Sequence, residues 1–124
     1  MLTTTKILLV DDEQDILDLL SYNFKKQGYE VHTALDGNEA IIEVSSFHPD
    51  IIVSDILMPN TSGIKMCRLL KADERYKNIP VIFLSASNDD YLALNSLDAG
   101  AIKYLSKPVH IPILFDLVKS VVKH

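Results

Sequence analysis

The sequence lacks the usual features of a secreted, membrane-spanning or nucleic-acid-binding protein. Its one cysteine, Cys67, cannot form an internal disulfide, which favours a reducing compartment. The first residues, MLTTTK, contain no apolar segment like that of a signal peptide, and no apolar run approaches the ~20 residues that a membrane span needs. The 12 basic residues, against 17 acidic ones, form no cluster that would favour nucleic-acid binding. We therefore expect a cytoplasmic protein.

The length and hydrophobic content fit one compact domain that spans residues 1–124. The 124 residues, 48% of them hydrophobic, suffice for one full core and leave no room for a second. Strand-like apolar runs alternate five times with segments of helical period, which predicts an α/β domain with a mostly parallel sheet. The expected strands cover residues 6–10, 29–34, a run from Ile51 that carries Asp55 at its end, 81–84 and 101–105.

Five helices are expected to follow these strands. They cover residues 14–27, a segment from the turn at 36–38 to the His48-Pro49 pair, a segment from about Gly63, a segment from the cap-forming cluster 87–90 to about 99, and a last segment with Pro112 in its first turn. Gly28 and Gly100 stand where the first and fourth helices should end. The alternation of strands and helices therefore accounts for the whole chain.

The polar residues of interest all follow strands. Asp11, Asp12 and Glu13 follow the first strand, Asp55 ends the third, Ser85 follows the fourth and Lys107 follows the fifth. In a doubly wound sheet the carboxyl ends of the parallel strands lie at the same edge. We therefore expect these side chains to converge on one crevice.

Three carboxylates in one small site need a compensating charge. Two like charges ~4 Å apart repel by roughly 4 kcal/mol at an effective dielectric of 20, so either one carboxylate stays protonated or a cation lies among Asp11, Asp12 and Asp55. Hard oxygen ligands suit Mg²⁺, which also lets an anion approach. A phosphoryl group would then meet the metal, the Lys107 ammonium and the Ser85 hydroxyl, with Asp55 as the in-line nucleophile.

These residues also carry a family resemblance. The acidic pair Asp11-Asp12, Asp55 with Met58-Pro59 and Gly63, Ser85-Ala86, and Tyr104 before Lys107-Pro108 occur in this order at strand ends. Over essentially its whole length the chain resembles the receiver domain of bacterial two-component response regulators. The resemblance implies a flavodoxin-like, three-layer α/β fold with a five-stranded parallel sheet of order 2-1-3-4-5 and five helices.

The same resemblance implies a phosphoacceptor function. Asp55 would accept a phosphoryl group from the phosphohistidine of a sensor histidine kinase or of a phosphotransfer protein. Mg²⁺ would be held by Asp12, by Asp55 and by the backbone carbonyl of Leu57, with Asp11 acting through water. The chain would be a regulatory domain and not an enzyme in the ordinary sense, because it would catalyse only the phosphorylation and dephosphorylation of its own aspartate.

The resemblance further implies a switch. Lys107 and Ser85 would bind phosphoryl oxygens, and the Lys107–Pro108 bond would be cis. Phosphorylation would draw the Ser85 hydroxyl inward, let Tyr104 turn, and change the surface of the fourth helix, fifth strand and fifth helix that faces an output partner or domain. Many DNA-binding relatives read Gly-Ala-Asp-Asp-Tyr at the fifth strand, whereas residues 100–104 here read Gly-Ala-Ile-Lys-Tyr. This departure argues against their salt-bridged dimer and leaves another phosphorylation-dependent dimer open.

Other interpretations of the same residues remain open. An Mg²⁺-dependent phosphatase of the haloacid-dehalogenase type would have a second acid where this chain has Leu57. A flavin or nucleotide binder would not place Asp11-Asp12-Glu13 where phosphate must bind. A receiver-like domain that only binds a partner would keep the fold without the chemistry. Taken singly, Asp11-Asp12 would be a helix cap, Ser85 a core hydroxyl and Tyr104 a strand aromatic.

Overall fold

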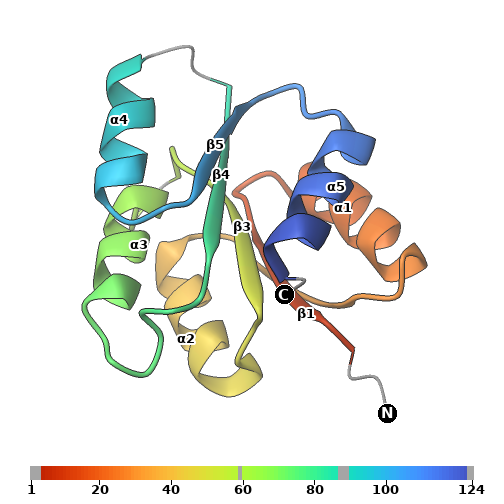
Figure 1. Cartoon of the computed structure of the whole chain (residues 1–124), viewed down its shortest axis with the longest axis horizontal. Coiled ribbons are helices and arrows are strands. Elements are labelled where there is room, and N and C mark those ends of the chain that lie inside the picture. Colours follow the sequence, from red (N-terminus) through yellow and green to blue (C-terminus); the bar gives the residue numbers. More distant parts are fainter. Residues whose placement is uncertain (1–3, 59, 87–89, 123–124) are drawn as a thin grey trace.

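The computed structural model describes residues 4–58, 60–86 and 90–122 of the chain. Strands and helices alternate along it (Figure 1). The strands are β1 (Lys6–Val10), β2 (Glu30–Ala34), β3 (Ile51–Asp55), β4 (Val81–Ser85) and β5 (Lys103–Ser106). The helices are α1 (Gln14–Lys26), α2 (Gly37–Phe47), α3 (Gly63–Lys71), α4 (Asp90–Asp98) and α5 (Ile111–Val122). No helix among the described residues is long and apolar enough to cross a membrane.

The five strands form one parallel sheet in the order β2-β1-β3-β4-β5, which confirms the predicted fold. Helices α1 and α5 cover one face of the sheet, and α2, α3 and α4 cover the other (Figure 1). Each face has its own apolar core, because alternate residues of a strand point to opposite sides. β3 and β4 are buried along their whole length, as central parallel strands should be.

Local signals in the sequence set the helix boundaries. Leu17, Leu20 and Phe24 form the buried face of α1, and Gly28, with a φ of 94°, follows its end in the left-handed conformation that glycine tolerates. The Asp36 carboxylate caps α2 by accepting a hydrogen bond from the Glu39 N–H. The Ser62 hydroxyl caps α3 in the same way through the Lys65 N–H. The two caps therefore set where α2 and α3 begin, and the glycine sets where α1 ends.

Two strands start later than predicted, for the same reason. The fifth strand begins at Lys103 and not at Ala101, because the Ala101 N–H donates to the carbonyl of Ser96 at the end of α4. The second begins at Glu30 and not at Tyr29, because the Tyr29 N–H donates to the Phe24 carbonyl of α1. In both cases a helix terminus occupies the amide that the strand would have used. The predicted cap cluster at 87–89 and Pro59 lie outside the described residues.

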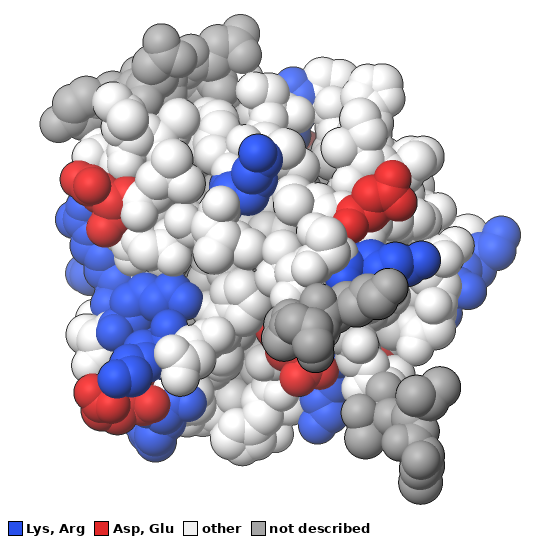
Figure 2. Space-filling view, viewed as in Figure 1, with Lys and Arg blue, Asp and Glu red and all other residues white. Residues whose placement is uncertain are grey.

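The surface carries charges of both signs. On the face shown in Figure 2, basic and acidic side chains lie next to one another in several small groups, and uncharged surface lies between these groups. Two of the exposed ion pairs join neighbours in the loop after α3, Arg75 with Asp73 and Lys77 with Glu74. Because exposed pairs of this kind contribute little to stability, the two apolar cores carry most of the folding free energy.

Candidate functional site

Three carboxylates meet at the carboxyl edge of the sheet. Asp11 and Asp12 follow β1, and Asp55 ends the neighbouring strand β3. One carboxylate oxygen from each of the three lies within 4.8 Å of the oxygens from the other two. Asp11 and Asp55 are buried, with 2% and 8% of their surface exposed, whereas Asp12 faces the solvent. The parallel sheet thus brings together acids that are more than forty residues apart in the sequence.

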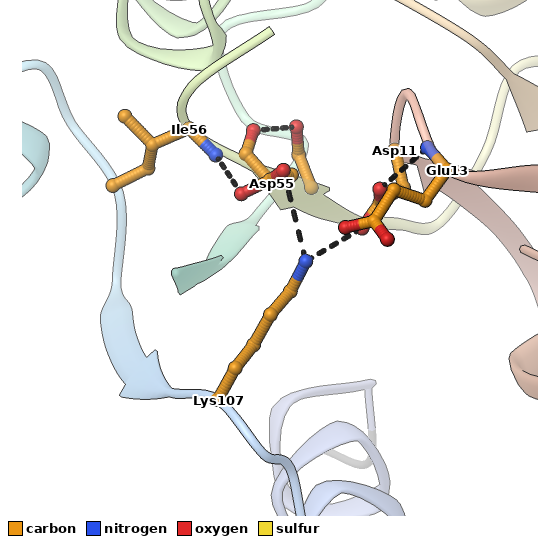
Figure 3. A network of polar contacts seen from close by, with 6 residues as sticks. Asp11, Glu13, Asp55, Ile56 and Lys107 are labelled. Atoms are coloured by element: carbon orange, nitrogen blue, oxygen red, sulfur yellow. Dashed lines mark hydrogen bonds and ion pairs between the residues drawn. The ribbon is translucent and has the colours of Figure 1, made fainter. Parts of the chain in front are cut away.

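Lys107 reaches this cluster from the loop between β5 and α5. Its Nζ donates a hydrogen bond to Asp11 Oδ2 at 2.9 Å and lies 3.6 Å from Asp55 Oδ2 (Figure 3). Only 13% of its side chain is exposed, so the ammonium is held between two largely buried carboxylates. The Lys107–Pro108 peptide bond is cis, as the family resemblance implied.

Backbone amides orient the two buried carboxylates. The Ile56 N–H donates to Asp55 Oδ1 at 2.8 Å, and the Glu13 N–H donates to Asp11 Oδ1 at 2.9 Å (Figure 3). Asp11 also donates its own N–H to the carbonyl of Ala34, at the end of β2. The second oxygen of each carboxylate, Oδ2, faces Lys107.

The surroundings of the cluster disfavour the ionised form of Asp55. Burial raises the pKa of the Asp55 carboxyl above its ordinary value; the Lys107 ammonium opposes this, and the charges of Asp11 and Asp12 add to it. Burial by itself would lower the pKa of Lys107, but the hydrogen bond to Asp11 and the charges of Asp55 and Asp11 outweigh it and raise that pKa. The surroundings therefore favour the charged form of Lys107 and disfavour the ionised form of Asp55.

Two further residues named by the sequence lie on the neighbouring strands. Ser85 ends β4 and is buried; β4 pairs with β3 such that Asp55 lies beside Leu84. The Ser85 carbonyl accepts a hydrogen bond of 2.7 Å from the Lys107 N–H, which ties the two loops together. Tyr104 is half-buried on β5 and packs against the core on the α2–α3–α4 side of the sheet. Leu57 lies in the loop after β3 with 59% of its surface exposed.

One set of contacts at this edge was not anticipated from the sequence. Asn60 and Thr61, which sequence reasoning treated only as turn residues, form hydrogen bonds with Asp36 and Asn38 at the start of α2. The only signal in the sequence is a short polar stretch at each place, Asn-Thr in one loop and Asp-Gly-Asn in the other. Polar stretches of this kind are common in turns and do not reveal which segment they contact.

Comparison with known proteins points to one family. The sequence matches the family described as "Response regulator receiver domain" over residues 7–119. It is 39% identical over 103 residues to the alkaline phosphatase synthesis transcriptional regulatory protein PhoP of Bacillus subtilis, an alignment that covers 83% of this chain. The same alignment covers 42% of PhoP, so the chain matches less than half of that relative.

Solved structures give the same result. The chemotaxis response regulator CheY4 of Vibrio cholerae superposes with a TM-score of 0.89 at 30% identity, over 96% of this chain and 99% of that one. A putative response regulator from Chloroflexus aurantiacus superposes with a TM-score of 0.92 at 29% identity, over 98% of this chain and 100% of that one. The BeF₃-activated DrrB receiver domain has a TM-score of 0.88 at 31% identity, over 98% of this chain and 100% of that one.

Proposed function

The chain belongs to the response regulator receiver domain family of two-component signalling, and we propose that it is a phosphoacceptor switch in which Asp55 receives the phosphoryl group. The donor would be the phosphohistidine of a sensor histidine kinase or of a phosphotransfer protein. One carboxylate oxygen of Asp55 would attack phosphorus; the new O–P bond forms as the P–N bond to the histidine breaks. The electron pair of that bond stays on the imidazole nitrogen.

A single arrangement carries this proposal: a strand-end aspartate held beside both an ammonium and two further carboxylates. The Lys107 Nζ lies 3.6 Å from Asp55 Oδ2, and Asp55 is buried enough to be shielded from bulk water. The phosphoryl oxygens carry negative charge in the transition state, and an ammonium fixed beside Asp55 would stabilise that charge. Ser85, at the end of the next strand, would donate its hydroxyl to another of these oxygens.

The acidic cluster fits a bound Mg²⁺. Three carboxylate oxygens within 4.8 Å of one another match the hard oxygen ligands that this ion prefers. A divalent cation would also offset the burial and the neighbouring negative charges that raise the pKa of Asp55. Asp12 and Asp55, together with the backbone carbonyl of Leu57, would hold the ion, with Asp11 acting through water. When bound, the ion would neutralise the carboxylates and stabilise charge on the phosphoryl oxygens.

An apolar hollow beside Lys107 supports a protein as the phosphoryl donor. It has a volume of about 380 Å³ and is lined by residues of α1, the end of β4 and the loop that carries Lys107. Leu19 of α1 borders it with 54% of its surface exposed. A small-molecule donor would not need an apolar surface next to the acceptor, whereas a helical donor protein would.

The output of the switch would lie on the other side of Lys107. Phosphorylation would draw Ser85 toward the phosphoryl group, let Tyr104 turn inward, and so change the surface formed by α4, β5 and α5. This surface would control an output partner or domain, and the protein would act in the cytoplasm of a bacterial cell. A phosphorylation-dependent dimer through the same surface would use other contacts than the acid-rich strand of many relatives, because Ile102 and Lys103 stand at those positions.

Phosphorylation by a small donor tests the proposal directly. Incubation with acetyl phosphate and Mg²⁺ should add one phosphoryl group, measured by intact mass, and the group should be released in alkali as an acyl phosphate is. The Asp55→Asn variant should gain none, whereas Asp98→Asn, a change at an exposed acid on α4, should behave like the wild type. Equal labelling of Asp55→Asn would overturn the assignment of the acceptor.

A further inference from the structure

The loop between β3 and α3, which follows Asp55, is tied to the start of α2. The Asn60 side-chain amide donates to Asp36 Oδ2 at 3.0 Å, and the Thr61 hydroxyl donates to Asn38 Oδ1 at 2.6 Å. The Gly37 N–H donates to the Thr61 carbonyl at 3.1 Å. We call these five residues, Asp36, Gly37, Asn38, Asn60 and Thr61, the loop clamp.

The loop clamp is a close and specific contact. A Cβ at Gly37 would lie 2.6 Å from the Thr61 carbonyl oxygen and 2.8 Å from its Cγ2, so only glycine allows the two backbones to approach this closely. Thr61 is buried, with 7% of its surface exposed. Asn60 has a φ of 66°, the left-handed conformation that asparagine tolerates better than most residues, and its bond to Asp36 favours that conformation.

Both sides of the loop clamp lead to a carboxylate of the site. On the α2 side, Ala34 lies two residues before Asp36, and its carbonyl accepts the N–H of Asp11 at 3.1 Å. On the other side, the Gly63 N–H closes the β3–α3 loop onto the Ile56 carbonyl at 2.9 Å. Ile56 in turn donates its N–H to Asp55 Oδ1. The clamp therefore joins the segment bonded to Asp11 with the segment bonded to Asp55.

We propose that the loop clamp positions the carboxylates of Asp11 and Asp55 relative to each other and thereby sets the affinity of the cluster for Mg²⁺. This inference rests on the proposed function, because it assigns Asn38, Asn60 and Thr61 as positioning residues for the same site. None of them touches the cluster; each acts through the backbone of the loop or of the start of α2.

The physical reason is that the cluster must keep like charges at short range. The three carboxylates share the single ammonium of Lys107, so a net repulsion acts between the segments that carry them. The clamp opposes this with hydrogen bonds between neutral and charged groups away from the charges themselves. Groups that orient metal ligands through hydrogen bonds typically change metal affinity severalfold or more when removed.

Each of three variants removes one side-chain hydrogen bond of the clamp and leaves the backbone bond from Gly37 to Thr61 in place. Thr61→Val keeps the shape and the Cγ2 contact but loses the hydroxyl. Asn60→Gly keeps the positive φ but loses the amide, and Asn38→Ala removes the acceptor of Thr61 from the opposite side, at an exposed position of α2. Each should weaken Mg²⁺ binding, measured by calorimetric titration, by about threefold to tenfold. Each should also speed hydrogen exchange of the Gly37 N–H, which donates to the Thr61 carbonyl.

The matched control is Ser62→Ala. Ser62 is in the same loop, but its hydroxyl caps α3 by accepting from the Lys65 N–H and belongs to none of the clamp contacts. Its loss should lower the free energy of unfolding and leave both the Mg²⁺ affinity and the Gly37 exchange rate unchanged. If the clamp had only a structural role, Thr61→Val and Ser62→Ala would both lower the free energy of unfolding, and both would bind Mg²⁺ as tightly as the wild type.

The outcomes separate this inference from the proposed function. Wild-type protein that binds no Mg²⁺ and accepts no phosphoryl group would overturn both. Wild-type protein that does both, with clamp variants that bind Mg²⁺ equally well, would overturn the positioning role alone. Faster Gly37 exchange in a variant with unchanged Mg²⁺ affinity would also overturn the positioning role. It would show that the clamp had been loosened without any effect on the metal site.

Discussion

Lys107 forms its hydrogen bond with Asp11 and not with Asp55: its Nζ lies 2.9 Å from Asp11 Oδ2 and 3.6 Å from Asp55 Oδ2. The ammonium is therefore anchored by one carboxylate while it faces the other. Asp55 interacts with the charge of the ammonium but accepts no hydrogen bond from it, which leaves an oxygen of Asp55 available for another bond.

Removing the ammonium should raise the pKa of Asp55 further. Burial already raises this pKa, and the charge of Lys107 is the strongest influence that lowers it. In Lys107→Ala the midpoint of the Asp55 carboxyl, followed by ¹³C NMR without metal, should move to higher pH. Lys103→Ala, a change at an exposed lysine of β5, should leave it in place. An unchanged midpoint in Lys107→Ala would show that the two groups are not coupled.

Neutralising Asp55 should stabilise the metal-free protein at pH 7. Because its pKa is raised in the folded state, the stability that Asp55 contributes is present at low pH and is lost as the pH rises through the folded-state pKa. Asp55→Asn should therefore melt at a higher temperature than wild type at pH 7, and the difference should shrink toward pH 3.5. A gain of order 1 kcal/mol corresponds to roughly 4 °C for a domain of this length. A lower melting temperature for Asp55→Asn at pH 7 would contradict this account.

Mg²⁺ should stabilise the fold through Asp12. A ligand that binds only the folded state adds about 2.7 kcal/mol when its concentration is a hundredfold above its Kd, so the melting temperature of wild type should rise with Mg²⁺. Asp12→Ala should lose most of this rise. Because Asp12 is exposed, the same change should alter the metal-free melting temperature little. Asp15→Ala removes a nearby acid in the first turn of α1 and should keep the full rise; equal loss in both variants would mean a general charge effect.

Acid should loosen the contact between α2 and the β3–α3 loop. Hydrogen bonds from the Glu39 N–H and from the Asn60 amide hold the pKa of the Asp36 carboxyl below its usual value. A group with a lowered folded-state pKa stabilises the fold above its unfolded-state pKa and loses that effect as the pH falls through the folded-state value. The Glu39 amide proton shift should therefore titrate with a midpoint below 3.8. In Asp36→Asn, which still offers a capping oxygen, this titration should disappear.

The sequence predicted the order of the elements and the place of the polar residues because both follow from short-range patterns. Apolar runs located all five strands, and Asp11, Asp55, Ser85 and Lys107 were recognised at or just after strand ends. The expected start of β5 lay two residues too early and that of β2 about one, because the N–H groups of Tyr29 and Ala101 still close the helices before them. Each of these bonds reaches a carbonyl only five residues back, across a glycine in the left-handed conformation, so Gly28 and Gly100 already carried the local signal for it.

Contacts between distant side chains were beyond the sequence. Asn60 and Asp36 are 24 residues apart, and neither belongs to a periodic pattern that would link them. The choice of Asp11 over Asp55 as the hydrogen-bond partner of Lys107 depends on differences in distance of less than 1 Å. Side chains that meet across a sheet edge can be expected as a group, but their pairing is fixed only by the packed backbone.

The three carboxylates of the cluster differ in exposure, because Asp12 faces the solvent and Asp11 and Asp55 are buried. An ion arriving from solution would therefore meet Asp12 first. The fraction of protein carrying the ion would then follow the free magnesium concentration of the surroundings. Readiness to accept a phosphoryl group would thus depend on the ionic state of the cell as well as on the arrival of a donor.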